Sequence, residues 1–235
     1  MKKTAKLIAL AVALVAGFGP SNANAAEGFK LGADVVSSYV WRGGELGDSP
    51  AIQPNLSYTC KSGLSIGAWG SYALEKSTPS PVAGQSDYRY KEVDLTVSMP
   101  IGPVTLGVTD YYIPVGEVTN TFNFGNDSAN TVEVSASYAK DKLGLMAGVF
   151  VGGNDYDNAV YCEANYQIYS KDGYTAKATL GLGSEDYYGD QFGVTTSDKI
   201  ALVNTGISVS KDRYTASAIY NPDTEKSFLV FMASF

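Results

Sequence analysis

The sequence predicts an all-β fold, a single antiparallel, up-and-down barrel of about twelve strands that crosses a membrane. Three observations predict it. Apolar and polar residues alternate in segments of about nine to eleven residues, the length that a tilted membrane strand needs. The connections between these segments are alternately short and long. The first residues have the composition of a secretory signal peptide.

The expected signal peptide covers residues 1–25, and the barrel is expected to cover residues 26–235. A basic start and an apolar stretch precede the small-residue sequence Ala23-Asn24-Ala25, which predicts cleavage before Ala26. The alternative, a membrane-anchoring helix, needs about 20 apolar residues. The apolar run is shorter than that, and two glycines and a proline interrupt the residues after it. We therefore expect export from the cytosol.

Composition excludes several classes of protein. The chain contains 25 glycines and 17 tyrosines, and no second long apolar stretch follows the first, which excludes a bundle of membrane helices. Removing the three lysines of the signal peptide from a net charge of −7 leaves −10, which argues against nucleic acid as a partner. Two cysteines are too few for a disulfide scaffold.

Period-two alternation defines the expected strands. In the first of them Phe29, Leu31, Val35, Tyr39 and Trp41 share one face, and polar residues occupy the other. The expected strands are 29–41, 52–60, 64–74, 91–99, 103–112, 131–139, 143–151, 159–169, 174–183, 199–209, 214–220 and 226–235.

The connections indicate which end of the barrel is which. The short ones are 61–63, 100–103, 140–142, 170–173 and 211–213, and the longer, polar ones are 42–49, 75–90, 113–130, 152–158, 184–198 and 221–225. Short periplasmic turns and longer extracellular loops are typical of outer-membrane barrels. A secreted β-sandwich or ligand-binding barrel would also alternate, but it has little reason to sort its connections by length.

Aromatic residues gather near both ends of the expected strands. Such rings are expected at the two membrane interfaces, although tyrosine is also common in strands generally. The aromatic residues near the loop ends are Tyr39, Trp41, Tyr72, Tyr112 and Tyr220, and those near the turn ends are Tyr58, Tyr138, Tyr174, Tyr214 and Phe235.

The last expected strand has the strongest alternation. Leu229, Phe231, Ala233 and Phe235 face one way, and we expect this strand to pair with the first one so that no edge is left unpaired in lipid. A final alternating strand that ends in phenylalanine also resembles the signal by which barrel-assembly machinery recognises outer-membrane proteins of Gram-negative bacteria. An ordinary buried strand would look similar.

Several stretches resemble the TorF family of predicted porins. They are VVSSYVWRG (35–43), PAIQPNLSY (50–58), GAWGSYAL (67–74), GVTDYYIP (107–114), and the late segments NTGISVSK and NPDTEKSFLV. The resemblance covers most of the chain after the signal peptide. It implies an outer-membrane barrel, and it supplies neither catalytic residues nor an agreed substrate.

The sequence argues against an enzyme and against a resident cofactor. It contains no histidine, which excludes a Ser-His or His-Asp mechanism and the usual zinc sites. Glu92 and Asp94 share a strand face and could act as a carboxylate pair, but a solvated lumen wall is the favoured interpretation. The loop 152–158 is rich in oxygen donors that suit calcium, and the loop 185–190 could engage a cation or a sugar. Plain surface loops are the favoured interpretation of both, so we expect no catalytic residue, no cofactor and no metal.

These observations predict a porin-like channel in the cell outer membrane for passive diffusion of small hydrophilic solutes. Twelve strands leave an opening on the order of 10 to 14 Å if no loop folds in. The expected pore-lining residues are Asp34, Arg42, Glu92, Asp94, Glu133, Glu163 and Lys177, whose acidic excess predicts a weak preference for cations. Arg42 lies at the start of the first long loop, where anchoring at the membrane interface is the alternative to a charge at the pore mouth. Expected partners are outer-membrane lipid, the assembly machinery and the solutes themselves. The alternative is a plugged structural or surface-recognition barrel that binds an external partner through its loops.

Overall fold

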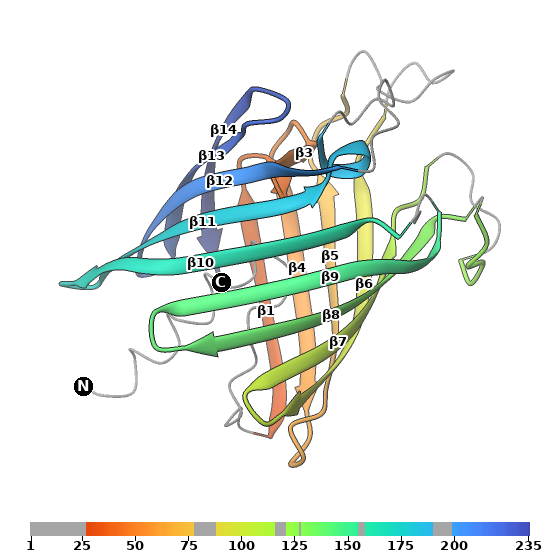
Figure 1. Cartoon of the computed structure of the whole chain (residues 1–235), viewed down its shortest axis with the longest axis horizontal. Helices are drawn as coiled ribbons and strands as arrows, with labels where there is room; N and C mark the ends of the chain where they lie inside the picture. The colour runs from red at the N-terminus through yellow and green to blue at the C-terminus, as the bar shows by residue number, and fades with distance from the viewer. Residues whose placement is uncertain (1–26, 78–87, 116–120, 127, 155–157, 190–198) are drawn as a thin grey trace.

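The computed structural model describes residues 27–77, 88–115, 121–126, 128–154, 158–189 and 199–235. Twelve antiparallel strands close into one barrel in which each strand pairs with its neighbours in sequence, so the predicted fold class is confirmed (Figure 1). The barrel strands are β1 (Gly28–Val36), β4 (Ala51–Thr59), β5 (Ser65–Ala73), β6 (Lys91–Ile101), β7 (Val104–Tyr112), β8 (Asn130–Lys140), β9 (Leu143–Gly153), β10 (Val160–Lys171), β11 (Tyr174–Ser184), β12 (Ile200–Lys211), β13 (Tyr214–Asn221) and β14 (Lys226–Ser234). The expected signal peptide and parts of the long loops lie outside the described residues.

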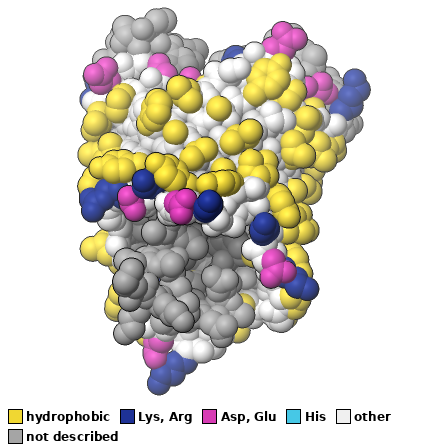
Figure 2. Space-filling view, turned by 90° about the vertical axis from the view of Figure 1, so that its left-hand side faces the viewer, with side chains coloured by type: hydrophobic (Ala, Val, Ile, Leu, Met, Phe, Trp, Pro, Cys, Tyr) yellow, Lys and Arg dark blue, Asp and Glu magenta, His cyan; other side chains and the backbone are white. Residues whose placement is uncertain are grey.

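Alternation along the strands separates an apolar outer surface from a polar interior. In β6, Val93 and Leu95 are 48% and 52% exposed, whereas Glu92 and Asp94 are buried inside the barrel. Successive side chains of a strand point to opposite faces, so one strand supplies both surfaces. Figure 2 shows the resulting apolar band, bordered by the charged residues of the turns. Among the described residues, no helix is both long and apolar enough to cross a membrane.

Short turns and long connections lie at opposite ends of the strands, as predicted. The turns after β4, β6, β8, β10 and β12 are short, and the longer connections lie along the top and the right of Figure 1. Asp141, Asp172 and Asp212 each have a φ of 54°, in the left-handed region that aspartate tolerates better than most residues. These aspartates therefore fit the tight turns in which they lie.

The barrel closes through a short seam between β1 and β14. Only three residue pairs join these strands, whereas β1 pairs with β4 along its whole length. At one end of the seam Phe235 N donates to Ala33 O (2.9 Å) and Ala33 N donates to Phe235 O (3.1 Å). At the other end Phe231 N donates to Ser37 Oγ (3.0 Å), a side-chain oxygen in place of a backbone carbonyl. Leu229, Phe231 and Phe235 face outward, as the alternation predicts.

The first strand is shorter than predicted. It ends at Val36, the chain bends at Ser37 and Ser38, and the following residues turn into the barrel instead of continuing along its wall. Tyr39 is therefore buried in the interior, and Trp41 packs there too, so the prediction that both lie on the outer aromatic ring is wrong. The other aromatic residues predicted at the strand ends keep outward or partly exposed positions.

The barrel interior differs between its two ends. Pairs of hydroxyl side chains, such as Thr59 with Ser65 (3.2 Å) and Ser210 with Thr215 (2.9 Å), line the end near the turns. Aromatic and aliphatic side chains of several strands cluster toward the loop end, around the segment that leaves β1. The loop end is therefore the more tightly packed half.

Candidate functional site

A small hairpin folded into the barrel forms the candidate site. Strands β2 (Tyr39–Trp41) and β3 (Gly44–Gly47) pair antiparallel, and Arg42 and Gly43 form the turn between them. Both turn residues have positive φ values, 49° and 84°, as a two-residue hairpin turn of type I′ requires. Glycine adopts this conformation freely, whereas an arginine there is strained. The arginine side chain must therefore make contacts that offset the strain.

Arg42 binds Glu133 on the barrel wall. Its two terminal nitrogens donate to the two carboxylate oxygens at 2.5 and 2.9 Å, a bidentate pair, and both side chains are buried. Tyr111 also donates to this carboxylate, at 3.3 Å. Breaking a buried pair of this kind by removing one partner typically costs about 3 to 5 kcal/mol, because the other charge is left uncompensated. The pair therefore holds the hairpin tip against β8.

Aromatic rings enclose the guanidinium group. Its central carbon lies 4.3 Å from the ring centroid of Trp41 and 4.5 Å from that of Tyr161. Arg42 also donates to the Tyr188 hydroxyl at 2.7 Å. Burial raises the pKa of Tyr188 to about 12, so its hydroxyl stays neutral at physiological pH and accepts this hydrogen bond. An ion pair, contacts with aromatic rings and a hydrogen bond thus all hold the guanidinium group of Arg42 in place.

Two glycines make room for this arrangement. A Cβ atom on Gly43 would collide with the backbone of Val203, and Asn221 Nδ2 donates to the Gly43 carbonyl at 3.3 Å. A Cβ atom on Gly148, in β9, would lie 2.6 Å from the carboxyl carbon of Glu133. The wall is therefore shaped to accept the hairpin tip and the carboxylate that binds it.

The remaining predicted pore-lining residues lie in the interior but do not all meet. We call Arg42, Glu133 and the rings of Trp41, Tyr111, Tyr161 and Tyr188 the Arg42 cluster. Beside it, Glu163 accepts hydrogen bonds from Tyr161 (2.8 Å) and Asn204 (3.4 Å). Glu92 accepts a hydrogen bond from the Tyr90 hydroxyl at 2.9 Å, on the side of the hairpin away from this cluster. The remaining three lie elsewhere: Asp94 beside Glu92, Asp34 at the seam, and Lys177 half-buried on β11. The expectation that Glu92 and Asp94 form a solvated lumen wall is wrong, because both side chains are buried.

Sequence reasoning missed several residues of the cluster. Tyr188 belongs to a segment interpreted from sequence as a surface loop, yet the π-helical turn η2 (Glu185–Gly189) places its side chain inside. Tyr111 and Tyr161 lie on the inward faces of their strands, and the alternation along each strand was a signal that would have placed both in the interior. Asn221 carries no comparable signal.

The two loops considered as cation sites contribute no metal ligands that the structure describes. The candidate calcium loop 152–158 falls partly outside the described residues, as does Asp190 of the 185–190 loop. In the described parts of the chain, no group of acidic, cysteine or histidine side chains could hold a metal ion. The described part of the 185–190 loop contributes to the candidate site through Tyr188, which contacts Arg42.

Comparison with known proteins gives a family. The profile of a family described as a bacterial protein of unknown function (Gcw_chp) matches residues 22–228. The chain belongs to this family. No curated protein matches the chain. The match covers nearly all the barrel of this Gcw_chp protein, including the hairpin and its partners on the wall.

The site of this Gcw_chp protein is suited to occlusion. It places a fixed cation and bulky rings across the interior of the barrel near the loop end. The Arg42–Glu133 pair joins two segments 91 positions apart, and the packing of Tyr39, Val40 and Trp41 holds the same hairpin against the wall. The hairpin and the side chains around it therefore narrow the barrel interior at this level.

Proposed function

We propose that the protein is an outer-membrane channel for small hydrophilic solutes whose narrowest point is the β2–β3 hairpin. The observation that carries the proposal is the Arg42–Glu133 pair, which holds a loop segment inside a barrel with an apolar outside and a polar inside. Solutes would pass the constriction near the extracellular loop end and then the hydroxyl-lined turn end. The channel is then narrower than the opening expected without an inward loop. We propose no enzymatic activity.

The charges around the constriction support a weak preference for cations. Asp34, Glu92, Asp94, Glu133 and Glu163 face the interior, against Arg42 and Lys177. Arg42 neutralises Glu133, so the excess of negative charge comes from the other carboxylates. Carboxylates near a pore favour cations, and salt weakens this effect.

Purified protein in planar bilayers and in liposomes tests the proposal. The parent should show small conductance steps and slow uptake of single sugars, and Arg42→Ala should raise both, because the hairpin loses its hold on the wall. Arg89→Ala is the matched control, since Arg89 hydrogen-bonds to backbone carbonyls at the loop end, outside the Arg42 cluster. Equal conductance in all three proteins would show that the pair does not set the constriction.

The second candidate is a plugged barrel that recognises an external partner through its loops. The packing of Phe150, Tyr161 and Tyr188 around Trp41 favours it, because a filled interior needs no channel. A plugged barrel would show no conductance in the parent and none in Arg42→Ala. The bilayer measurement therefore separates the two candidates.

A further inference from the structure

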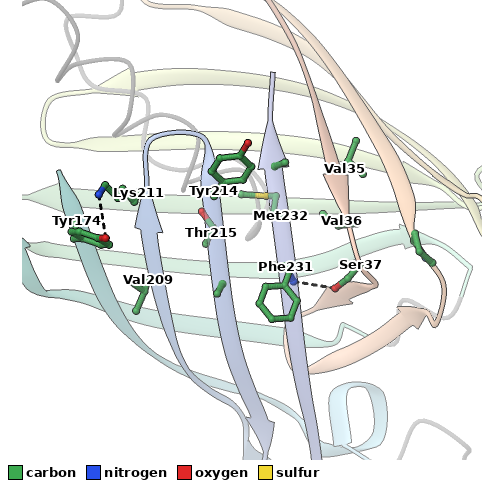
Figure 3. Close-up of a pocket in the computed structure, with 13 residues that line it drawn as sticks. Val35, Val36, Ser37, Tyr174, Val209, Lys211, Tyr214, Thr215, Phe231 and Met232 are labelled. Atoms are coloured by element: carbon green, nitrogen blue, oxygen red, sulfur yellow. Dashed lines mark hydrogen bonds between the residues drawn. The ribbon is translucent and has the colours of Figure 1, made fainter.

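An apolar groove lies on the outer surface of the barrel beside the seam. Its volume is about 490 Å3, and its walls come from strands β11 to β14 and from β1 (Figure 3). Val209, Tyr214 and Phe231 line it, and all three point outward, with 43%, 63% and 56% of their surfaces exposed. The groove thus opens to the surroundings of the barrel and not to its lumen.

The groove has one apolar and one basic end. Near the seam it is bounded by Val35, Ser37 and Phe231. At the turn end, Lys211 Nζ donates to the Tyr174 hydroxyl at 3.1 Å and lies 4.3 Å from the centroid of its ring. Arg213 lies in the adjoining turn, with its guanidinium carbon 5.3 Å from the ring centroid of Phe235. Both basic side chains are exposed, and neither forms a salt bridge with any residue that the structure describes.

We propose that this groove binds an anionic phospholipid, with one acyl chain along Val209 and Phe231 and the phosphate at Lys211 and Arg213. The proposal rests on the proposed placement in a lipid membrane. A lysine and an arginine at one end of an apolar groove are placed to bind the phosphate of a lipid whose acyl chain lies in the groove. Because the chain without the expected signal peptide has a net charge of −10, its overall charge repels anionic lipid, so retention must come from local contacts.

The headgroup contacts should provide the selectivity. An acyl chain gains little by moving from bilayer to groove, because both surroundings are apolar and only packing differs. A phosphate gains charge-assisted hydrogen bonds at the rim of the groove. The turn β8–β9 offers a comparison, since Lys140 and Lys142 flank an aspartate just as Lys211 and Arg213 do. That turn does not border the groove.

Native mass spectrometry of the full-length protein in detergent tests the site, with phosphatidylglycerol and phosphatidylcholine of identical acyl chains as probes. The parent should retain one phosphatidylglycerol in preference to phosphatidylcholine. Lys211→Ala with Arg213→Ala should weaken phosphatidylglycerol binding roughly tenfold. Lys140→Ala with Lys142→Ala, which removes the same charge, should leave it unchanged. The heat-dependent shift in gel migration confirms that each variant forms the barrel.

A second pair of variants tests the acyl-chain part of the groove. Ala216→Phe places a ring in the groove and should reduce lipid retention, whereas Ala136→Phe, outward on β8, should not. Equal loss in both turn variants, or full retention in Ala216→Phe, would overturn the proposal. Displacement of the lipid by millimolar inorganic phosphate would assign the basic end to free anions instead. Binding in detergent needs no conduction, so failure here is distinct from failure of the channel proposal.

Discussion

Arg42 and Glu133 lie 91 positions apart in the sequence and form a buried bidentate ion pair inside the barrel, with nitrogen–oxygen distances of 2.5 and 2.9 Å. Arg42 belongs to a hairpin tip and Glu133 to the wall strand β8. The pair is therefore the main polar link between the inward hairpin and the barrel.

Removing either partner of this pair should destabilise the protein. We expect Arg42→Met or Glu133→Leu alone to lower the free energy of unfolding by about 3 to 5 kcal/mol, because each leaves a buried charge without its partner. The double variant should lose less than the sum of the two single variants, since both charges are then absent. Urea unfolding in lipid vesicles measures these energies. Additive losses would show that the two side chains do not interact.

Enlarging Gly148 should weaken the Arg42–Glu133 pair from the side of the barrel wall. Gly148→Ala adds a methyl group where the Glu133 carboxylate lies, so the carboxylate must shift away from Arg42. We expect larger conductance and lower stability than in the parent. Gly152→Ala, in the same strand, is the control because its Cβ atom would meet nothing within 4 Å. A parent-like Gly148→Ala variant would place the carboxylate elsewhere.

Deleting Phe235 should impair barrel formation. The deletion removes both backbone hydrogen bonds to Ala33 from a seam with three residue pairs, and it also removes the aromatic ring proposed for recognition by the assembly machinery. Heat-modifiable gel migration of outer-membrane fractions measures the folded population. Phe235→Ala keeps the backbone bonds and isolates the contribution of the ring. Normal insertion of the deletion variant would contradict both roles.

Ion selectivity should depend on Glu92 and Glu163 more than on Glu133. Arg42 already neutralises Glu133, whereas Glu92 and Glu163 accept hydrogen bonds from the neutral side chains of Tyr90, Tyr161 and Asn204. Glu92→Gln with Glu163→Gln should shift the reversal potential in a potassium chloride gradient toward anions, and the shift should shrink as salt rises.

The control for this shift is Glu75→Gln, on an exposed loop, which should leave the reversal potential unchanged. An anion-preferring parent would overturn the assignment of the two glutamates as the source of selectivity.

Alternation was sufficient to predict the barrel because each strand presents apolar side chains on its outer face and polar ones on its inner face. The inward hairpin was not predicted, since Tyr39 and Trp41 resume the alternation of β1 in the same register after Ser37. Two signals were available: Ser37-Ser38 within an apolar run, and Arg42-Gly43 as a two-residue turn. The partner of Arg42 could not be inferred, because it depends on which strand faces the hairpin after closure. The alternation of side chains along the strand predicts that Glu133 points inward, but it does not predict which residue the carboxylate contacts.

Single-channel conductance of a barrel without its inward hairpin tests the central claim most directly. Residues 39–47 are replaced by a glycine-serine linker of equal length, which preserves the connection between β1 and β4 and removes Arg42 with its aromatic neighbours on the hairpin. With barrel folding verified by heat-modifiable migration, we predict conductance steps several times larger than those of the parent. Steps equal to those of the parent would show that the hairpin does not form the constriction.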